Sequence, residues 1–253
     1  MTALVRAELL KLRTVRLPMW LLLTTLVLVL LSVLATVLTA GLEGAPLQRD
    51  DPDLLARAVG AGASSGNVVV LVLGILTLTQ EFRFGTATPS FLVTPRRWRV
   101  LVAKIVAVAV TGVLFAAVSA VLALGIGAVL IPLRDGTLTW DVTVLQVLLG
   151  GALVMVLYGP IGMAVGALVR NQIAAVVGTL AWIFIAEQLL VALLPEVGKW
   201  TPGGASSAVL QLGGLATTRG ELLPVWGGAL LLVAYTVVLS VIAARLTLRR
   251  DLT

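Results

Sequence analysis

The sequence predicts an all-α polytopic membrane protein with six transmembrane helices, and three observations carry this prediction. Hydrophobic residues make up 59% of the 253 residues and charged residues 12%, whereas a soluble domain has roughly 45–50% and 25%. Six stretches are apolar over at least about 20 residues, the length that crosses roughly 30 Å of hydrocarbon. These stretches do not alternate between polar and apolar residues, which excludes the strands of an outer-membrane barrel.

The expected spans belong to one transmembrane domain that covers residues 1–253. Each should be helical, because backbone groups in lipid must find their hydrogen-bond partners within the segment. The third and fourth are longer than the hydrocarbon core requires, so we expect them to tilt, kink or protrude. The spans are predicted at about residues 17–40, 61–81, 100–131, 142–169, 172–194 and 223–244.

Residues 1–16 are expected to form an elbow helix that lies in the membrane interface before the first span. The apolar residues that share one helical face are Leu4, Val5, Leu9, Leu12 and Val15. Arg6 and Arg13 lie opposite this face. Glu8 and Arg16 break the pattern, and a solvated basic tail is the alternative.

The basic residues predict the orientation. Six crossings place both termini on one side of the membrane. The 18 Lys and Arg fall on that side, except for Arg49, Arg57, Arg134, Lys199 and Arg219. The positive-inside rule therefore places both termini in the cytoplasm and favours a multi-pass protein of the plasma membrane. Because this rule also accounts for the net charge of +6, we expect the lipid bilayer and no nucleic acid as a partner.

Glu187, in the fifth span, is the only ionisable residue well inside a predicted span. A carboxylate at mid-membrane costs roughly 2.5–3.5 kcal/mol on insertion scales. We therefore expect Glu187 to face a water-filled vestibule or the bundle interior, with Gln188 beside it and Thr77 of the second span as a further candidate for the translocation path. The alternative is a group near enough to the outer surface to hydrate itself.

Residues 195–222, before the last span, are rich in Pro and Gly and contain an apolar stretch too short to cross the membrane. This composition suits a re-entrant outer segment, with Trp200 and Pro202 as candidate gate residues. The fourth span carries Pro160 and the pair Gly162 and Gly166, a spacing that lets helices approach closely. Tight packing is the preferred interpretation of that span, over a gating hinge.

The loop at residues 82–98 joins the second and third spans. Thr88-Pro89 and Thr94-Pro95 are typical of helix starts, so a short helix over about 89–93 is expected. Exposed apolar groups in a cytoplasmic loop indicate a protein partner. A basic turn held by anionic lipid headgroups is the alternative. The apolar groups are Phe82, Phe84, Phe91 and Leu92, and Glu81 and Arg83 are placed to pair at the partner's rim.

This layout resembles the permease subunits of bacterial export-type ATP-binding-cassette transporters, the type-2 permease family. The resemblance rests on Glu81-x-x-x-Gly85-Thr86, Pro95-x-Arg97 and Lys104, and on Leu9, Lys11 and Arg13 before the first span. It implies that residues 85–93 are a coupling helix seated in a separate nucleotide-binding ATPase subunit. It implies further that the second and fifth spans line the path, that the outer segment is a gate, and that a second permease subunit, identical or different, completes the transporter. The coupling residues that it implies are Glu81, Phe82, Arg83, Phe84, Gly85, Thr86, Phe91 and Leu92.

The expected function is export of an amphipathic or hydrophobic substrate, powered by the partner. The chain has no Gly-x-x-x-x-Gly-Lys-Ser/Thr motif, so ATP and Mg²⁺ are expected in the partner and no cofactor in this chain. It also has no His and no Cys, which excludes imidazole catalysis and thiolate metal sites, and we expect no enzymatic activity. The alternatives are an ATP-independent six-span secondary transporter, which should show paired intramembrane ionisable groups and a repeat, or a membrane scaffold.

Overall fold

A computed structural model of the chain describes residues 1–83, 97–169, 171–213 and 221–249. Within these ranges the regular structure is entirely helical. The elements are α1 (Thr2–Thr14), α2 (Leu17–Thr39), α3 (Leu54–Arg83), α5 (Arg97–Leu133), α6 (Val142–Val169), α7 (Gln172–Ala181), the π-helical turn η1 (Trp182–Ala186), α8 (Glu187–Leu193), α9 (Pro195–Gly198), α10 (Pro202–Val209) and α11 (Val225–Arg249).

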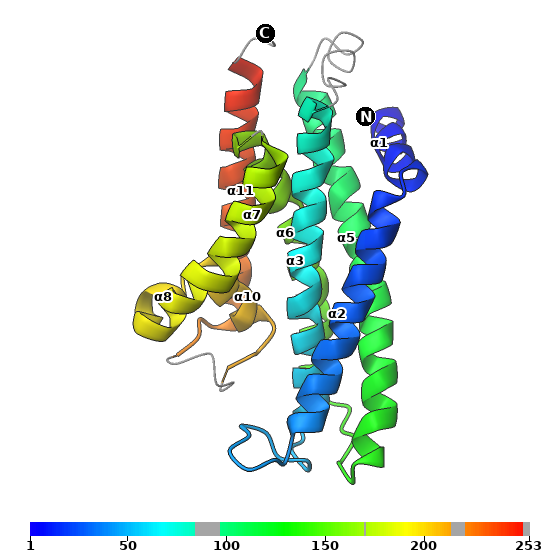
Figure 1. The fold of residues 1–253 in the computed structure, drawn as a ribbon, viewed down its shortest axis with the longest axis vertical. Coiled ribbons are helices and arrows are strands. Elements are labelled where there is room, and N and C mark those ends of the chain that lie inside the picture. Colours follow the sequence, from blue (N-terminus) through cyan, green and yellow to red (C-terminus); the bar gives the residue numbers. More distant parts are fainter. Residues whose placement is uncertain (84–96, 170, 214–220, 250–253) are drawn as a thin grey trace.

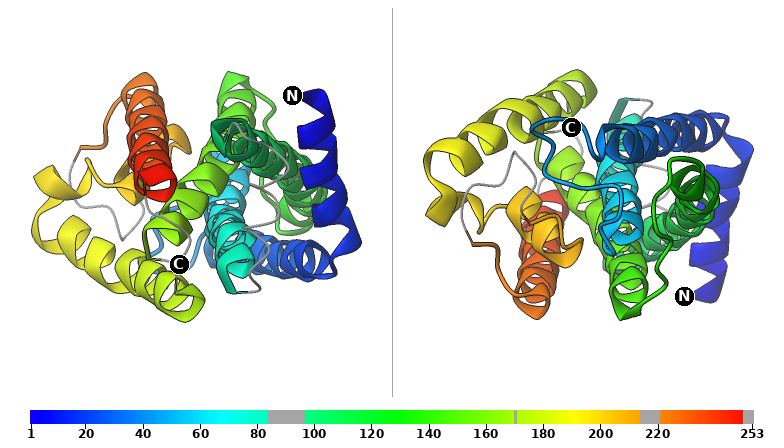
Figure 2. Two further views of the ribbon diagram at one scale, coloured as in Figure 1. Left: turned by 90° about the horizontal axis from the view of Figure 1, so that it is seen from above. Right: turned by 90° about the horizontal axis from the view of Figure 1, so that it is seen from below.

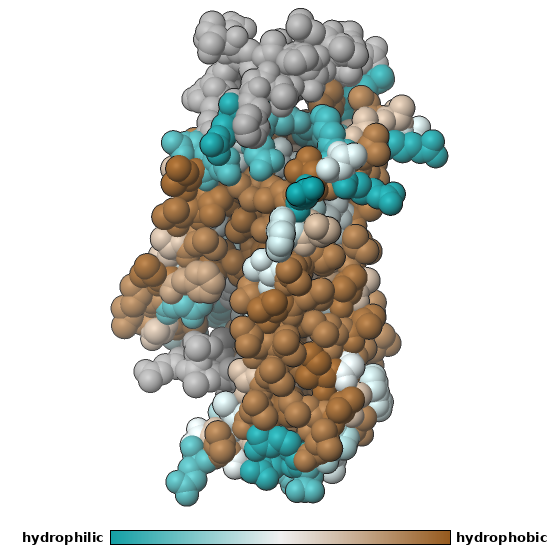
Figure 3. Space-filling view, turned by 45° about the vertical axis from the view of Figure 1, so that its right-hand side comes forward, coloured by the Kyte–Doolittle hydropathy of each residue, from teal (hydrophilic) through white to brown (hydrophobic). Residues whose placement is uncertain are grey.

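The predicted number of spans is confirmed. In the described part of the chain, six helices are long and apolar enough to cross a membrane. Figure 3 shows one face of the molecule, on which a hydrophobic band fills the middle and hydrophilic residues gather toward both ends. The candidate spans are Leu17–Thr39, Leu54–Glu81, Trp98–Leu133, Val142–Val169, Gln172–Leu193 and Val225–Arg245. This is the architecture of a multi-pass membrane protein.

The second span begins earlier than the predicted residue 61, because α3 starts at Leu54. The prediction stopped short of the charged Arg57. In the structure Arg57 is accommodated within the helix, since its guanidinium donates to the Gly213 carbonyl oxygen at 2.6 Å. Leu54 and Leu55 are also buried in a core cluster with α2, α5 and α6. A residue more than 150 positions away therefore supplies a hydrogen-bond acceptor to the charged group that the predicted span excludes.

The helices form three groups. The helices α3 and α6 lie at the centre, with α2 and α5 on one side and α7, α8, α10 and α11 on the other (Figures 1 and 2). The helix α1 lies against the outside of α2 and α5. The end of α3, the start of α5 and the end of α11 lie at the end of the bundle where α1 is found (Figure 1). Six alternating crossings require this arrangement.

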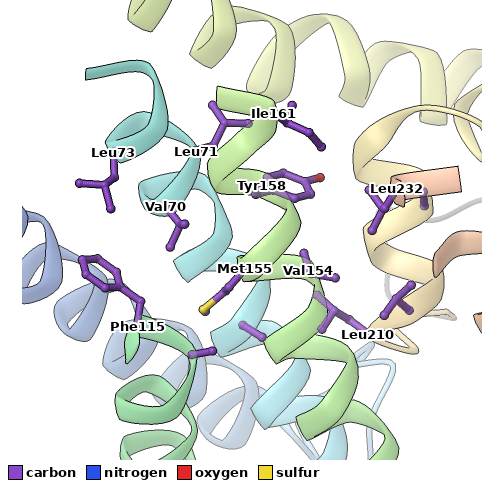
Figure 4. Packing of buried hydrophobic residues seen from close by; sticks show 14 of the residues in the cluster. Val70, Leu71, Leu73, Phe115, Val154, Met155, Tyr158, Ile161, Leu210 and Leu232 are labelled. Carbon is purple, nitrogen blue, oxygen red and sulfur yellow. The ribbon is translucent and has the colours of Figure 1, made fainter. Parts of the chain in front are cut away.

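The central pair is packed at backbone contact. A Cβ atom at Gly74 would lie 2.0 Å from the Gly159 carbonyl oxygen, and one at Gly162 would lie 2.0 Å from the Leu71 carbonyl oxygen. Neither position has room for a side chain. The preferred interpretation of the glycines in the fourth span, tight packing, is therefore confirmed, and α6 runs unbroken through Pro160. Figure 4 shows the core around this pair, with side chains from α3, α5 and α6 meeting between the helices.

The fifth span differs from the others, because it consists of α7, η1 and α8 in succession. A π-helical turn inserts an extra residue into the helical ladder and commonly marks a functional position. Here the turn ends directly before Glu187. The span leans away from the central pair in Figure 1, and its large apolar side chains are mostly exposed, with Ile173 at 75% and Phe184 at 62%.

The outer segment folds back along the bundle. The Tyr158 hydroxyl, 16 residues into α6, donates to the Pro202 carbonyl oxygen at 2.9 Å. A Cβ atom at Gly150 would lie 2.8 Å from the Val209 carbonyl oxygen, and one at Gly228 would lie 2.6 Å from the Ala205 carbonyl oxygen. At 1.5 Å per residue, Tyr158 lies roughly 24 Å along α6. The helix α10 therefore lies beside the middle of α6 rather than beyond its end.

Candidate functional site

A cavity of about 540 Å³ separates α2 and α3 from the fifth span and the outer segment. Its walls come from the second half of α2, the first half of α3, the middle of α6, and η1 to α10. The side chains that bring polar groups to it are Ser32, Thr36, Ser64, Ser65, Asn67, Tyr158, Glu187, Gln188, Lys199, Ser206, Ser207 and Glu221. We call this space the outer cavity. It brings together Glu187 and Gln188, as the sequence predicted.

Glu187 joins the fifth span to the outer segment. Its side chain is buried at 3% exposure, so it does not lie at the protein surface. Its Oε1 atom accepts a hydrogen bond from the Gly203 amide at 2.6 Å, in the first turn of α10. The Thr201 hydroxyl caps the same turn by accepting from the Gly204 amide at 3.1 Å. Because a Cβ atom at Gly203 would lie 2.6 Å from the Glu187 carboxyl carbon, only glycine fits there.

The walls of the outer cavity differ in chemistry. Hydroxyl groups reach the cavity from α2, α3 and α10, and the Ser32 and Ser65 hydroxyls are hydrogen-bonded to each other between α2 and α3. Apolar side chains reach it from η1 and α8, among them Ile183, Phe184 and Val191. A molecule with a polar and an apolar part fits such a space better than a wholly polar one.

Two carboxylates and one ammonium group line the outer cavity. The ammonium group of Lys199 is paired with Glu196. Glu187 has no ion-pair partner in the ranges that the structure describes. The charged lining is therefore anionic in balance.

Trp200 and Pro202 lie next to the outer cavity without lining it, and their backbones hold the outer segment in place. The Tyr235 hydroxyl donates to the Trp200 carbonyl oxygen at 2.9 Å, as Tyr158 does to Pro202. Thr77 lies away from the cavity, and its hydroxyl donates to the Leu73 carbonyl oxygen at 2.7 Å within α3. In Figure 4 the Tyr158 hydroxyl points away from α3, toward the ribbon of α10 and α11.

A second polar site lies at the opposite end of α3. We call Glu8, Lys11, Glu81 and Lys104 the four-charge cluster. The ammonium group of Lys104, at 2% exposure, lies 2.7 Å from Glu8 Oε2 and also contacts Glu81. The ammonium group of Lys11 lies 2.9 Å from Glu8 Oε1 and 3.5 Å from Glu81 Oε1. The cluster joins α1 to the last turn of α3 and the start of α5.

Electrostatics hold this cluster ionised. Burial alone raises the pKa of Glu8, but the charges and hydrogen bonds of Lys104 and Lys11 outweigh it and bring the pKa below the ordinary value. Burial likewise lowers the pKa of Lys11, but hydrogen bonds and the charges of Glu8 and Glu81 outweigh it and raise the pKa. Two positive and two negative groups therefore balance each other where the loop of residues 82–98 begins and ends.

The coupling residues are described only in part. Phe82 lies in the last turn of α3, and the Arg83 guanidinium donates to Gln172 Oε1 at 3.4 Å. Glu81 is engaged within the chain through the four-charge cluster. Phe84, Gly85, Thr86, Phe91, Leu92 and the short helix expected over 89–93 lie outside the described residues. Their roles stay predictions.

Sequence reasoning missed several residues. Glu8 was taken to break the amphipathic pattern of the N-terminal helix, yet it is the buried residue of α1, between Leu4, Val5, Leu9 and Leu12 on the half-buried face. Its signal was an acid in an otherwise basic segment. Tyr158, Asn67 and the serines of the outer cavity carried no motif.

Comparison of the chain with protein-family models and with curated proteins gives no match.

Proposed function

We propose that the chain is the permease subunit of an ATP-binding-cassette exporter of the type-2 kind, driven by a separate ATPase subunit. The observation that carries the proposal is the convergence of the motif residues. Lys11, Glu81 and Lys104 are separated by up to 93 positions, and each belongs to the pattern on which the resemblance rests. In the fold they meet in the four-charge cluster. This contact between residues of separate motifs supports the resemblance.

The cluster gives the coupling loop a stiff base. Residues 84–96 connect the two helices that the cluster clamps, so a force on this loop acts on α3 and α5 together and on α1 through Glu8. The helix α3 is continuous from Leu54 to Arg83. Glu81 lies at its cytoplasmic end in this proposal, and Ser64 and Asn67 lie at the outer cavity. One helix therefore links the ATPase side to the cavity.

Transport in this proposal is alternating access. Closure of the ATPase dimer on ATP pulls the coupling loops of two permeases, which tilts α3 and α5 and reshapes the outer cavity. Energy enters as the different affinity of the closed ATPase for two permease states, and no chemistry takes place in this chain. The second permease subunit, identical or different, faces this one. The amphipathic lining of the outer cavity supports an amphipathic substrate.

The outer segment is proposed as a re-entrant gate. The helix α10 lies beside the middle of α6, and its first turn is held by Glu187, Thr201 and the Tyr158 hydroxyl. Since the fifth span ends where this segment begins, a movement of α8 moves α10 with it. Both termini are then cytoplasmic and the outer cavity opens toward the outside.

An ATP-independent secondary transporter is the second candidate, because a buried carboxylate beside a cavity also suits ion-coupled transport. Affinity purification of the tagged chain from its native membrane separates the two. We expect a nucleotide-binding subunit to co-purify and its ATPase activity to rise with the permease present. Purification of the intact chain without such a subunit, in several mild detergents, would contradict the exporter.

Gly85→Trp tests the docking itself. A bulky side chain at a position of close approach should abolish the stimulation of the ATPase while the variant still inserts and folds. The matched control is Gly125→Trp, in the half of α5 far from the coupling loop, where a Cβ atom meets nothing within 4 Å. Normal stimulation in Gly85→Trp would remove residues 85–93 from the interface with the ATPase.

A further inference from the structure

Glu187 is a buried carboxylate with a neutral partner. Charged side chains are almost never fully buried unless they are paired. Glu8 and Glu81 follow that rule, since each contacts two lysines. Glu187 instead accepts a hydrogen bond from a backbone amide and lines a cavity. A cation that enters the outer cavity can therefore pair with this carboxylate.

The protein compensates this carboxylate only in part. The Gly203 amide belongs to the first turn of α10, and a helix N-terminus carries roughly half a positive charge. Among the described residues that line the cavity, only Glu221 and Lys199 are charged besides Glu187. Glu221 adds a second carboxylate, and Lys199 is held by Glu196. An anion in this space would approach two carboxylates, whereas a cation would complete the pairing of Glu187.

The rest of the lining defines the body of the ligand. Ile183, Phe184 and Val191 of η1 and α8 bring apolar surface to the lining. The volume of about 540 Å³ lies within the roughly 300–1,000 Å³ of small-molecule sites. Tyr158 brings an aromatic ring to the same cavity, and aromatic rings attract organic cations. Serine, Asn67 and Gln188 side chains offer neutral hydrogen-bond partners around the charge.

We propose that the outer cavity binds an amphiphilic organic cation, with Glu187 as its counter-ion. This deepens the proposed function by naming the substrate class, and it rests on that function only for transport, because binding requires no ATPase. The cation pairs with the free face of the carboxylate, and its apolar body lies against η1 and α8.

Two nearly isosteric ions of opposite charge test the proposal. The full chain is placed in lipid nanodiscs without any ATPase, and binding of tetraphenylphosphonium and tetraphenylborate is measured by equilibrium dialysis, with empty nanodiscs as the baseline. We expect saturable binding of the cation above the baseline and none of the anion. In Glu187→Gln, which keeps an oxygen for the Gly203 amide, the cation should bind about 30-fold more weakly or worse.

Two variants separate charge from structure. Glu43→Gln removes an exposed acid from the α2–α3 loop, outside the cavity, and should bind the cation like the unchanged protein. Thr201→Ala removes a neutral hydroxyl that bonds to Glu187 and caps α10, while Glu187 keeps its charge, so the preference for the cation over the anion should persist. Equal binding of both ions, unchanged binding in Glu187→Gln, or loss of the preference for the cation in Thr201→Ala would overturn the proposal.

These outcomes are independent of the exporter assignment. Failure to find an ATPase subunit would remove the proposed function and leave the binding result standing. Failure of cation binding, with an ATPase subunit present, would remove the substrate class alone.

Discussion

The two ends of α3 handle buried carboxylates in opposite ways. At one end, Glu81 shares Lys104 and Lys11 with Glu8, so that every charge has an opposite neighbour. At the other end, the outer cavity holds Glu187, whose partners among the described residues are neutral: the Gly203 amide and the Thr201 hydroxyl. Burial is similar, but the partners differ. A balanced cluster fixes helices to one another, whereas a carboxylate without a counter-ion is suited to binding one.

The spans that carry these two sites also differ in how much of their surface is buried. The most apolar stretches of the second and fourth spans are 67% and 61% buried inside the protein, whereas that of the fifth span is 6% buried. The four-charge cluster is therefore attached to α3, a helix that is packed on most of its surface. Glu187 lies on the fifth span, the least buried of the six. A movement of α3 relative to the fifth span would open and close the outer cavity between them.

The largest expected effect comes from Lys104→Met. It leaves the Glu8 and Glu81 carboxylates with only the half-exposed Lys11 as their shared cation, and breaking a buried ion pair typically costs about 3–5 kcal/mol. The free energy of unfolding in mixed micelles, followed by circular dichroism as denaturing detergent is added, measures this loss. Lys11→Met is the control, because the Lys11 side chain is 50% exposed and exposed pairs contribute about 1 kcal/mol or less. Equal losses in both variants would show that Lys104 is not the centre of the cluster.

The sequence predicted the six spans because long apolar stretches are a local property. It also indicated Glu187 and Gln188 as candidate site residues, since an acid in an apolar run is conspicuous. The four-charge cluster was not predictable in this way. Glu8 and Lys104 are 96 positions apart, and their pairing depends on how α1 lies against α5. The start of α3 was misplaced for the same reason, because the partner of Arg57 is Gly213.

The outer cavity was predictable only in its most conspicuous residues. Ser32, Ser64 and Ser65 look like ordinary polar interruptions of a span, and their meeting depends on the crossing of α2 and α3. Thr77 is a polar residue of the second span, yet a hydroxyl in a helix can donate to a carbonyl oxygen of the preceding turn, as this one does. Single-helix reasoning does not reveal which face of a span meets a cavity.

An intermediate loss of stability should distinguish the closely packed helices α3 and α6 from the fifth span. Gly162→Ala puts a Cβ atom 2.0 Å from the Leu71 carbonyl oxygen, so α3 and α6 must separate, at a cost of about 1–3 kcal/mol. The same change at Gly178, in α7, meets nothing within 4 Å and should be neutral or stabilise the helix by up to about 1 kcal/mol. The detergent titration applied to Lys104→Met compares the two. Similar losses would mean that the fifth span is packed as tightly as the fourth.

The smallest effect is the pH dependence of α1. Since the pKa of Glu8 is lowered in the fold, its contribution is present above the ordinary glutamate value of about 4.3 and is lost as the pH falls through the lower folded value. Since the pKa of Lys11 is raised, its contribution is present below about 10.4 and is lost as the pH rises through the higher folded value. The attachment of α1 should therefore be constant across neutral pH and weaken only at the extremes, by about 1 kcal/mol or less because of solvent screening.

The chain has no Cys, so a spin label on Leu10→Cys, at a position 62% exposed, reports the motion of α1 alone. Its mobility should increase in acid below the ordinary glutamate range. In Glu8→Gln the acid step should disappear and the label should be more mobile already at neutral pH, because Lys104 then lacks one of its two carboxylates. An acid step of the same size in Glu8→Gln would assign the titration to another group and would separate α1 from the clamp on α3 and α5.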